Sequence, residues 1–182
     1  MSSAQTSSVE QTSRAVRSAA STRGGAARVV ILGPGASGKS TLARRLGEIT
    51  GLPVVELDKV FWLPGLAATP RQQWIEIQQS LIVQPTWIMD GDLGPYDAVE
   101  VRLRAADTVI FLDFPIILCA WRALLRSRER WDFWRWLLRY PRARMRRAIA
   151  DYAPHATVHI ISSGRTGVEQ LCTEARARAE RG

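Results

Sequence analysis

The sequence predicts an α/β domain whose core is a mainly parallel β-sheet. The main observation is that short, β-branched apolar runs alternate along the chain with longer segments of helical periodicity. A second observation is size, because 182 residues suit one domain better than two. A third is composition: 46% of the residues are hydrophobic and 8% aromatic, which is enough to bury a core and excludes a chain that is disordered throughout.

Most of the expected strands are followed by a helix. The run Val29–Leu32 ends before a glycine and predicts a buried strand. Residues 39–50 predict the next helix, with Leu42, Leu46 and Ile49 on one face and Gly51-Leu52-Pro53 as its end. Further strands are expected at 53–57, 86–89, 108–112 and 157–161. Further helices are expected at 71–83, 116–127 and 167–178. A helical stretch that is interrupted near Pro141 is expected to continue from the second of these helices to about residue 150.

Residues 1–27 differ from the rest, since they are rich in Ser, Thr and Ala and hold few large apolar side chains. Such a segment buries too little surface to offset its ordering entropy, so we expect a disordered or frayed tail ahead of a domain at 28–182. A transit peptide has a similar composition and stays an alternative for this segment.

The chain carries no pattern of an exported or membrane-spanning protein. The N-terminus has no apolar core of a signal peptide, and no apolar run reaches the roughly 18 residues that span a bilayer. Cys119 and Cys172 have no metal-binding spacing, so neither a disulfide scaffold nor a structural zinc site is expected. A reduced, cytoplasmic setting with no membrane partner is the prediction.

The positive charge of the chain is concentrated in one segment. The formal net charge is +8, and 23 of the 25 basic residues are arginines. Between Arg102 and Arg147 lie twelve arginines and four acids, so this segment accounts for the whole surplus. A cationic surplus favours an anionic ligand or nucleic acid. A nucleic-acid interaction would be located at its end, at Arg142, Arg144, Arg146 and Arg147.

A phosphate-binding loop follows the first predicted strand. The motif G-x-x-x-x-G-K-[ST] is matched in full, and a predicted helix follows the loop. The matching residues are Gly33, Pro34, Gly35, Ala36, Ser37, Gly38, Lys39 and Ser40, and the next residue is Thr41. Glycines allow the backbone N–H groups to point at phosphate oxygens, Lys39 can reach the β- and γ-phosphates, and Ser40 can ligate Mg²⁺. We therefore expect residues 33–41 to bind ATP with Mg²⁺.

Among the classes that use such a loop, the chain is best read as a small kinase. No N-K-x-D motif for guanine is present, which disfavours a GTPase, and the chain is short for a motor. A small kinase needs only a phosphate loop, an acceptor pocket and a lid. The carboxyl ends of the strands form the ligand edge of such a sheet.

The chain resembles the adenylate-kinase-like P-loop proteins called DNA topology modulation proteins over about residues 28–175. The segments that carry this resemblance are Leu57–Gly65, Trp87–Gly91, Ala106–Pro115 and Arg135–Arg142. It implies a P-loop NTPase of nucleoside-monophosphate-kinase-like fold, with a five-stranded parallel sheet in the order 2-3-1-4-5 flanked by helices. It also implies an acceptor-binding insertion at about 59–85 and an arginine-bearing lid at about 122–147.

The resemblance assigns roles to residues at the strand ends and in the lid. Asp58 would contact the acceptor hydroxyl or water around Mg²⁺, and Asp90 would hold Mg²⁺ through water. Arg122 and Arg126 would pack on adenine and grip the γ-phosphate, with Arg126 the first candidate for stabilising the transferred group. Asp113 is expected to be structural. Weaker lid candidates are Arg128, Arg130 and Arg135, and Trp131, Trp134 and Trp136 are expected to be buried, with base stacking as the alternative.

The chain departs from adenylate kinases after Asp90-Gly91, because no arginine follows in Asp92–Tyr96. Arg71 and Arg102 are therefore the candidate ligands for an acceptor phosphate. The segment between Arg126 and Arg135 is short, which predicts either a minimal lid or weak closure with slow ATP hydrolysis beside transfer.

These residues predict an ATP-dependent kinase that transfers the γ-phosphoryl group to a small acceptor such as a nucleoside monophosphate. Lys39, Asp58, Arg122 and Arg126 would be its catalytic residues. One alternative is a kinase of small molecules resembling shikimate and gluconate kinases. Others are an ATP-binding nucleic-acid regulator without phosphotransfer and a protein that binds nucleotide without catalysis. The sequence makes no prediction of the oligomeric state.

Overall fold

A computed structural model describes residues 27–180 except 64, 66, 127–130 and 163. Five parallel strands form one sheet in the order β2-β3-β1-β4-β5, which confirms the expected fold and strand order. The strands are β1 (Ala27–Leu32), β2 (Val54–Glu56), β3 (Thr86–Asp90), β4 (Thr108–Leu112) and β5 (Thr157–Ile161). Residues 1–26 of the expected tail, and Arg128 and Arg130, lie outside the described part of the chain.

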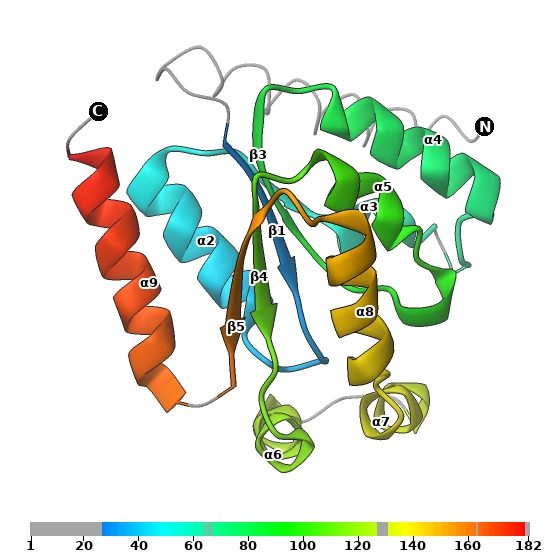
Figure 1. Ribbon diagram of the computed structural model, residues 1–182. Helices are drawn as coiled ribbons and strands as arrows, with labels where there is room; N and C mark the ends of the chain where they lie inside the picture. The colour runs from blue at the N-terminus through cyan, green and yellow to red at the C-terminus, as the bar shows by residue number, and fades with distance from the viewer. Residues whose placement is uncertain (1–26, 64, 66, 127–130, 163, 181–182) are drawn as a thin grey trace.

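Helices cover both faces of the sheet and its carboxyl end (Figure 1). On one face lie α2 (Lys39–Thr50) and α9 (Gly164–Ala179), and on the other α4 (Arg71–Ile82), α5 (Val99–Ala105) and α8 (Arg142–Tyr152). The short helix α3 (Leu57–Phe61) follows β2, and α6 (Ile116–Arg126) and α7 (Trp131–Leu138) lie below the strand ends in Figure 1.

The core consists of two apolar clusters, one on each face of the sheet. Successive residues of β1 alternate between them: Val30 and Leu32 pack into one cluster and Ile31 into the other. Because both faces are covered, the central strands are mostly apolar, and β3 is buried along its whole length. This explains why β1, β3 and β4 are recognisable in the sequence as continuous apolar runs.

The strand predicted at 53–57 is shorter than expected. β2 ends at Glu56, and Leu57 already begins α3. Asp58 therefore lies in the first turn of a helix and not at a strand end, although it stays at the carboxyl edge of the sheet. The third strand is longer than expected and includes Asp90 as its last residue.

The sequence did not predict α5 or the 3₁₀ turn at Gly94–Tyr96. In Val99–Ala105, apolar and charged residues alternate with period two, so no helical periodicity marks the segment. The tertiary structure nevertheless folds it as a helix that packs against α4 and α8. This helix turns Arg102 and Leu103 into the core.

Neither cysteine takes part in a disulfide. Cys119 and Cys172 are both free and buried, and each belongs to the cluster beneath α2 and α9. Among the described residues, no helix combines the length and the apolar character that a bilayer crossing requires.

Candidate active site

The phosphate loop connects β1 to α2 at the carboxyl edge of the sheet. Gly33 has a φ of +148°, and a Cβ there would stand 2.6 Å from the carbonyl oxygen of Leu112 at the end of β4. Only glycine fits this close approach. Ala36 and Gly38 also have positive φ, so the backbone curls as a phosphate-binding loop does.

The Lys39 ammonium is held over the mouth of this loop. Its Nζ donates hydrogen bonds to the carbonyl oxygens of Gly33 (2.9 Å) and Pro34 (3.0 Å). Lys39 is the first residue of α2, so the positive end of the helix lies at the same place. The next residue, Ser40, is exposed and, together with Lys39, lines a cavity that opens beside the loop. Charge and donors therefore converge on one anion-binding position.

Asp90 stands beside the loop, because β3 pairs with β1 in a register that places Asp90 next to Ile31. Its carboxylate is buried, and Oδ1 has no hydrogen-bond partner among the described residues. Burial raises the pKa of Asp90, and the Ser40 hydroxyl and the Lys39 ammonium partly offset this. An unpartnered buried carboxylate oxygen beside a serine hydroxyl is a donor set that fits Mg²⁺.

The protein alone offers few ligands to such an ion. No group of three or more His, Cys, Asp or Glu side chains able to hold a metal occurs among the described residues. Mg²⁺ is usually bound by one or two side chains together with nucleotide phosphates and water.

Asp58 faces the same space from α3. It is on the cavity surface, yet the surrounding protein desolvates it enough to raise its pKa, against the opposing effect of Lys39. The negative charges of Asp90 and Asp92 act in the same direction as desolvation. The structure therefore brings Asp58, Asp90 and Lys39 together at one edge, as the sequence predicted for their positions.

A cavity of about 1040 Å³ opens from the phosphate loop. Its floor is formed by the loop and its lysine. One wall carries an aromatic pair, Trp62 and Tyr96, whose rings lie 6.1 Å apart and are 38% and 53% exposed. The cavity is also lined by three exposed arginines: Arg135 of α7, Arg139 of the turn that follows it, and Arg144 of α8. The cavity thus combines cations, carboxylates and exposed ring faces.

Arg122 on α6 contacts the phosphate loop directly. Its Nη1 donates a 3.2 Å hydrogen bond to the carbonyl oxygen of Ser37, and its guanidinium lies 5.3 Å from the centre of the Phe114 ring. The side chain of its partner in the prediction, Arg126, lies outside the described part of the structure. Of the remaining lid candidates, Arg135 is described and faces the cavity.

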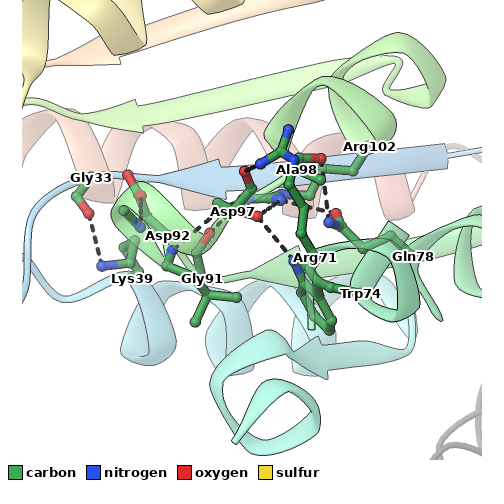
Figure 2. A network of polar contacts seen from close by, with 12 residues as sticks. Gly33, Lys39, Arg71, Trp74, Gln78, Gly91, Asp92, Asp97, Ala98 and Arg102 are labelled. Carbon is green, nitrogen blue, oxygen red and sulfur yellow. Dashed lines mark hydrogen bonds and ion pairs between the residues drawn. The ribbon is translucent and has the colours of Figure 1, made fainter. Parts of the chain in front are cut away.

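The prediction that Arg102 binds an acceptor phosphate is wrong. Its side chain is 0% exposed, and its terminal nitrogens donate to Asp97, Gln78 and the carbonyl oxygen of Gly91. The turn of α5 points it into the core (Figure 2). Arg71, in contrast, lines the cavity, with its guanidinium bonded to the Asp97 carbonyl oxygen and to Glu100.

Sequence reasoning did not assign Asp92, which the structure places in the cavity wall. Its carboxylate accepts hydrogen bonds from the Tyr140 hydroxyl and from the Gly94 backbone N–H. Burial raises the pKa of Asp92, and the Tyr140 hydrogen bond opposes that effect. No sequence spacing connects positions 92 and 140, so only the fold reveals this pair. The one clue in the sequence to a role for Asp92 is that it directly follows Asp90-Gly91.

Two of the four arginines that the nucleic-acid hypothesis depended on form ion pairs with Asp113. The Asp113 carboxylate, at the end of β4, is paired with Arg142 (3.4 Å) and with Arg146. Arg142 also donates to the carbonyl oxygen of Phe114. Asp113 therefore anchors α8, in agreement with the structural role expected for it. A third arginine, Arg144, lines the cavity.

Comparisons with known proteins show which folds the chain is similar to. No protein-family model and no curated protein matches the sequence, so the resemblance to DNA topology modulation proteins stays a prediction from motifs. Among solved structures, similar chains include an unliganded sugar kinase from Janibacter sp. HTCC2649, at 22% identity and a TM-score of 0.46, covering 85% of this chain and 92% of that one.

Two further similar structures are a deoxyadenosine kinase from M. mycoides with bound dCTP and a gluconokinase from Sinorhizobium meliloti 1021. The first is 12% identical, with a TM-score of 0.48, and covers 82% of this chain and 98% of that one. The second is 16% identical, with a TM-score of 0.48, and covers 87% and 94%. These names describe those proteins, and the assignment of a function to this chain depends on its own residues.

Proposed function

We propose that the protein is an ATP-dependent phosphotransferase that moves the γ-phosphoryl group of ATP to a small acceptor bound in the cavity. The observation that supports this best is the arrangement around the loop of residues 33–40. Lys39 and Ser40 open onto a cavity whose other wall supplies the carboxylate of Asp58 and exposed rings. A donor phosphate on the loop and an acceptor in the cavity would therefore be neighbours.

In this proposal, different residues bind the nucleotide, stabilise charge and orient the acceptor. Phosphoryl transfer needs positioning and charge stabilisation more than covalent catalysis, and Lys39 together with Arg122 and Arg126 supplies positive charge to the transferred group. Where the acceptor attacks through a hydroxyl, as a sugar or hydroxy acid does, Asp58 orients that hydroxyl by accepting its hydrogen bond. When bound, Mg²⁺ held by Ser40 and Asp90 neutralises charge on the β- and γ-phosphates.

The cavity wall indicates which acceptor to test first. The guanidinium groups of Arg71, Arg139 and Arg144 suit a phosphate or carboxylate on the acceptor. The exposed rings of Trp62 and Tyr96 suit stacking against a planar base, which favours a nucleoside monophosphate. A sugar acid or hydroxy acid also offers an anion to the arginines, and is the second acceptor class.

The experiment is a transfer screen with ATP labelled at the γ-phosphate. Nucleoside monophosphates form one arm, and gluconate, shikimate and neutral sugars form the other. We expect labelled product in one arm with wild-type protein and none with Lys39→Ala. Lys59→Ala is the matched control, since Lys59 is the only other lysine and forms an exposed pair with Glu56. ATP binding without transfer in either arm would contradict the proposal.

A further inference from the structure

Arg102 and Asp97 form an ion pair that is closed off from solvent. The side chains are 0% and 2% exposed, and Nη2 of Arg102 lies 2.6 Å from Oδ2 of Asp97. Nη1 of Arg102 lies 2.8 Å from the other carboxylate oxygen. Burial acts to raise the pKa of Asp97, but Arg102 outweighs it and holds that pKa below its usual value. The pair is therefore ionised throughout the physiological pH range.

Each member of the pair also holds backbone of the segment of residues 91–97, most of which lines the cavity. Nη2 of Arg102 donates to the carbonyl oxygen of Gly91 (3.0 Å), directly after Asp90. Oδ2 of Asp97 accepts from the Leu93 N–H (3.3 Å). These two contacts lie at the beginning of the segment of residues 91–97, and Asp97 itself is its end. Through Arg102, the pair thus connects the first and the last residue of this segment, Gly91 and Asp97 (Figure 2).

The same pair fastens the loop to α4. The indole Nε1 of Trp74 donates to Oδ1 of Asp97 (3.3 Å), and Nη1 of Arg102 donates to Gln78 (3.0 Å). Gln78 in turn donates to the carbonyl oxygen of Ala98 (3.2 Å). Trp74 and Gln78 are fully buried, so the attachment is rigid. The guanidinium of Arg102 thus joins α5 to the loop of residues 91–97 and to α4.

Stability alone does not explain such a pair. Removing two charges from water is costly, and well-packed apolar residues in place of a buried ion pair are often neutral or stabilising. What the pair adds is geometric: a planar fork with several acceptors permits one arrangement of the loop. The loop supplies Asp92 and Tyr96 to the cavity, and its last carbonyl oxygen receives Arg71 (2.9 Å).

We propose that Arg102 is a positioning residue of the acceptor site, acting through Asp97 and the Gly91 carbonyl oxygen. It holds the wall that carries Asp92, Tyr96 and Arg71 in a set place relative to Asp90 and the phosphate loop. This inference rests on the proposed function, since it assigns the wall to the acceptor. The nucleotide side of the cavity depends on residues 33–40 and does not need the pair.

The test removes the pair without leaving a lone buried charge. The double variant Arg102→Met with Asp97→Leu leaves no lone buried charge, but the other hydrogen-bond partners of the pair are left unsatisfied, so it is expected to fold with a lower unfolding midpoint than the wild type. Hydrogen exchange of the backbone amides then measures how firmly residues 91–97 are held. We expect faster exchange in residues 91–97 and unchanged exchange in residues 33–46. Arg104→Met is the matched control, because Arg104 is on the same helix and exposed.

Kinetics with the acceptor found in the transfer screen give the second readout. The KM for that acceptor should rise about tenfold or more in the double variant, while the KM for ATP stays within about twofold of the wild type. Arg102→Lys keeps the positive charge but not the planar guanidinium, so its KM for the acceptor should lie between those of the wild type and the double variant. A merely structural role would alter both KM values or neither.

Unchanged exchange in residues 91–97, or an unchanged acceptor KM with faster exchange, would overturn the positioning role. If the double variant does not fold, exchange and kinetics of Arg102→Lys decide the matter in the same way. A wild-type protein that binds ATP but phosphorylates no acceptor would contradict the proposed function instead. The positioning role in transfer would then fail with it, and exchange would show separately whether Arg102 holds the loop.

Discussion

The Arg122 guanidinium on α6 donates a hydrogen bond of 3.2 Å to the carbonyl oxygen of Ser37, 85 residues earlier in the chain. This contact ties the first helix after β4 to the backbone of the phosphate loop. It also leaves the guanidinium at the edge of the position where a nucleotide phosphate would lie. A cation already held at this place loses little conformational freedom when an anion binds.

Replacing Arg122 with alanine should therefore weaken ATP binding about 10- to 100-fold, since a hydrogen bond to a charged group contributes roughly 1.5–3 kcal/mol. Titration with a fluorescent ATP analogue measures this affinity. Arg147→Ala is the control, because Arg147 is an exposed arginine on α8 that is not among the residues lining the cavity. Equal affinities for the two variants would remove Arg122 from the nucleotide site.

Lys39→Ala should lower the transfer rate roughly 100- to 1000-fold, because one preorganised donor to a developing anion is lost. The fold should survive, since within the described part of the chain the ammonium donates its hydrogen bonds to two carbonyl oxygens of its own loop. Circular dichroism and an unfolding curve check the fold, and the labelled-ATP assay checks the rate. Substantial transfer by a folded Lys39→Ala protein would show that this lysine does not contact the transferred group.

The pH dependence of Mg²⁺-supported ATP binding should report Asp90. Burial raises the pKa of Asp90 above its ordinary value of 3.8, so the carboxylate becomes protonated at a less acidic pH than usual. Affinity should then fall as the pH drops through that raised pKa. Because the metal ion competes with the proton, a higher Mg²⁺ concentration should move this fall to lower pH. Asp90→Asn should remove this pH dependence. If ATP affinity still falls at acidic pH in that variant, the titrating group is not Asp90.

Tyr140→Phe should destabilise the protein by about 1–3 kcal/mol at neutral pH, because the buried Asp92 carboxylate loses its hydroxyl donor. The folded-state pKa of Asp92 is already raised, and losing a donor to its charged form raises it further. Protonation at acidic pH then relieves the cost. The deficit should shrink as the pH falls through the raised pKa toward 3.8. Denaturant unfolding at neutral and mildly acidic pH tests the sign, and a deficit that grows in acid would refute it.

Asp113→Ala should cost only about 1 kcal/mol, despite removing a buried carboxylate. Its partners Arg142 and Arg146 are 31% and 53% exposed, so both can regain water when the pair is lost. Arg142 also keeps its bond to the carbonyl oxygen of Phe114. The measurement is the free energy of unfolding in denaturant. A loss above about 3 kcal/mol would mean that α8 depends on Asp113 far more than on its apolar packing.

Much of the fold could be predicted because its elements carry local patterns. The helix at 39–50 and the strands at 108–112 and 157–161 agree residue for residue with α2, β4 and β5. The helix α5 could not be found in this way, since Val99–Ala105 alternates apolar and charged residues and becomes helical only through its packing against α4 and α8. The misassignment of Arg102 follows from that omission.

From the sequence alone followed the phosphate loop, the alternation of five strands with helices other than α3 and α5, and the expectation that Lys39, Ser40, Asp58 and Asp90 lie at the carboxyl edge. Motifs and periodicity determine these features, because both depend on residues close together in the chain. The tertiary structure alone decided which charged residues face the cavity and which are buried. It sends Arg71 to the wall and Arg102 to the core, and it joins Asp92 to Tyr140. Such choices depend on partners distant in the sequence, since a buried charge is stable only where the fold supplies its counter-charge and hydrogen bonds.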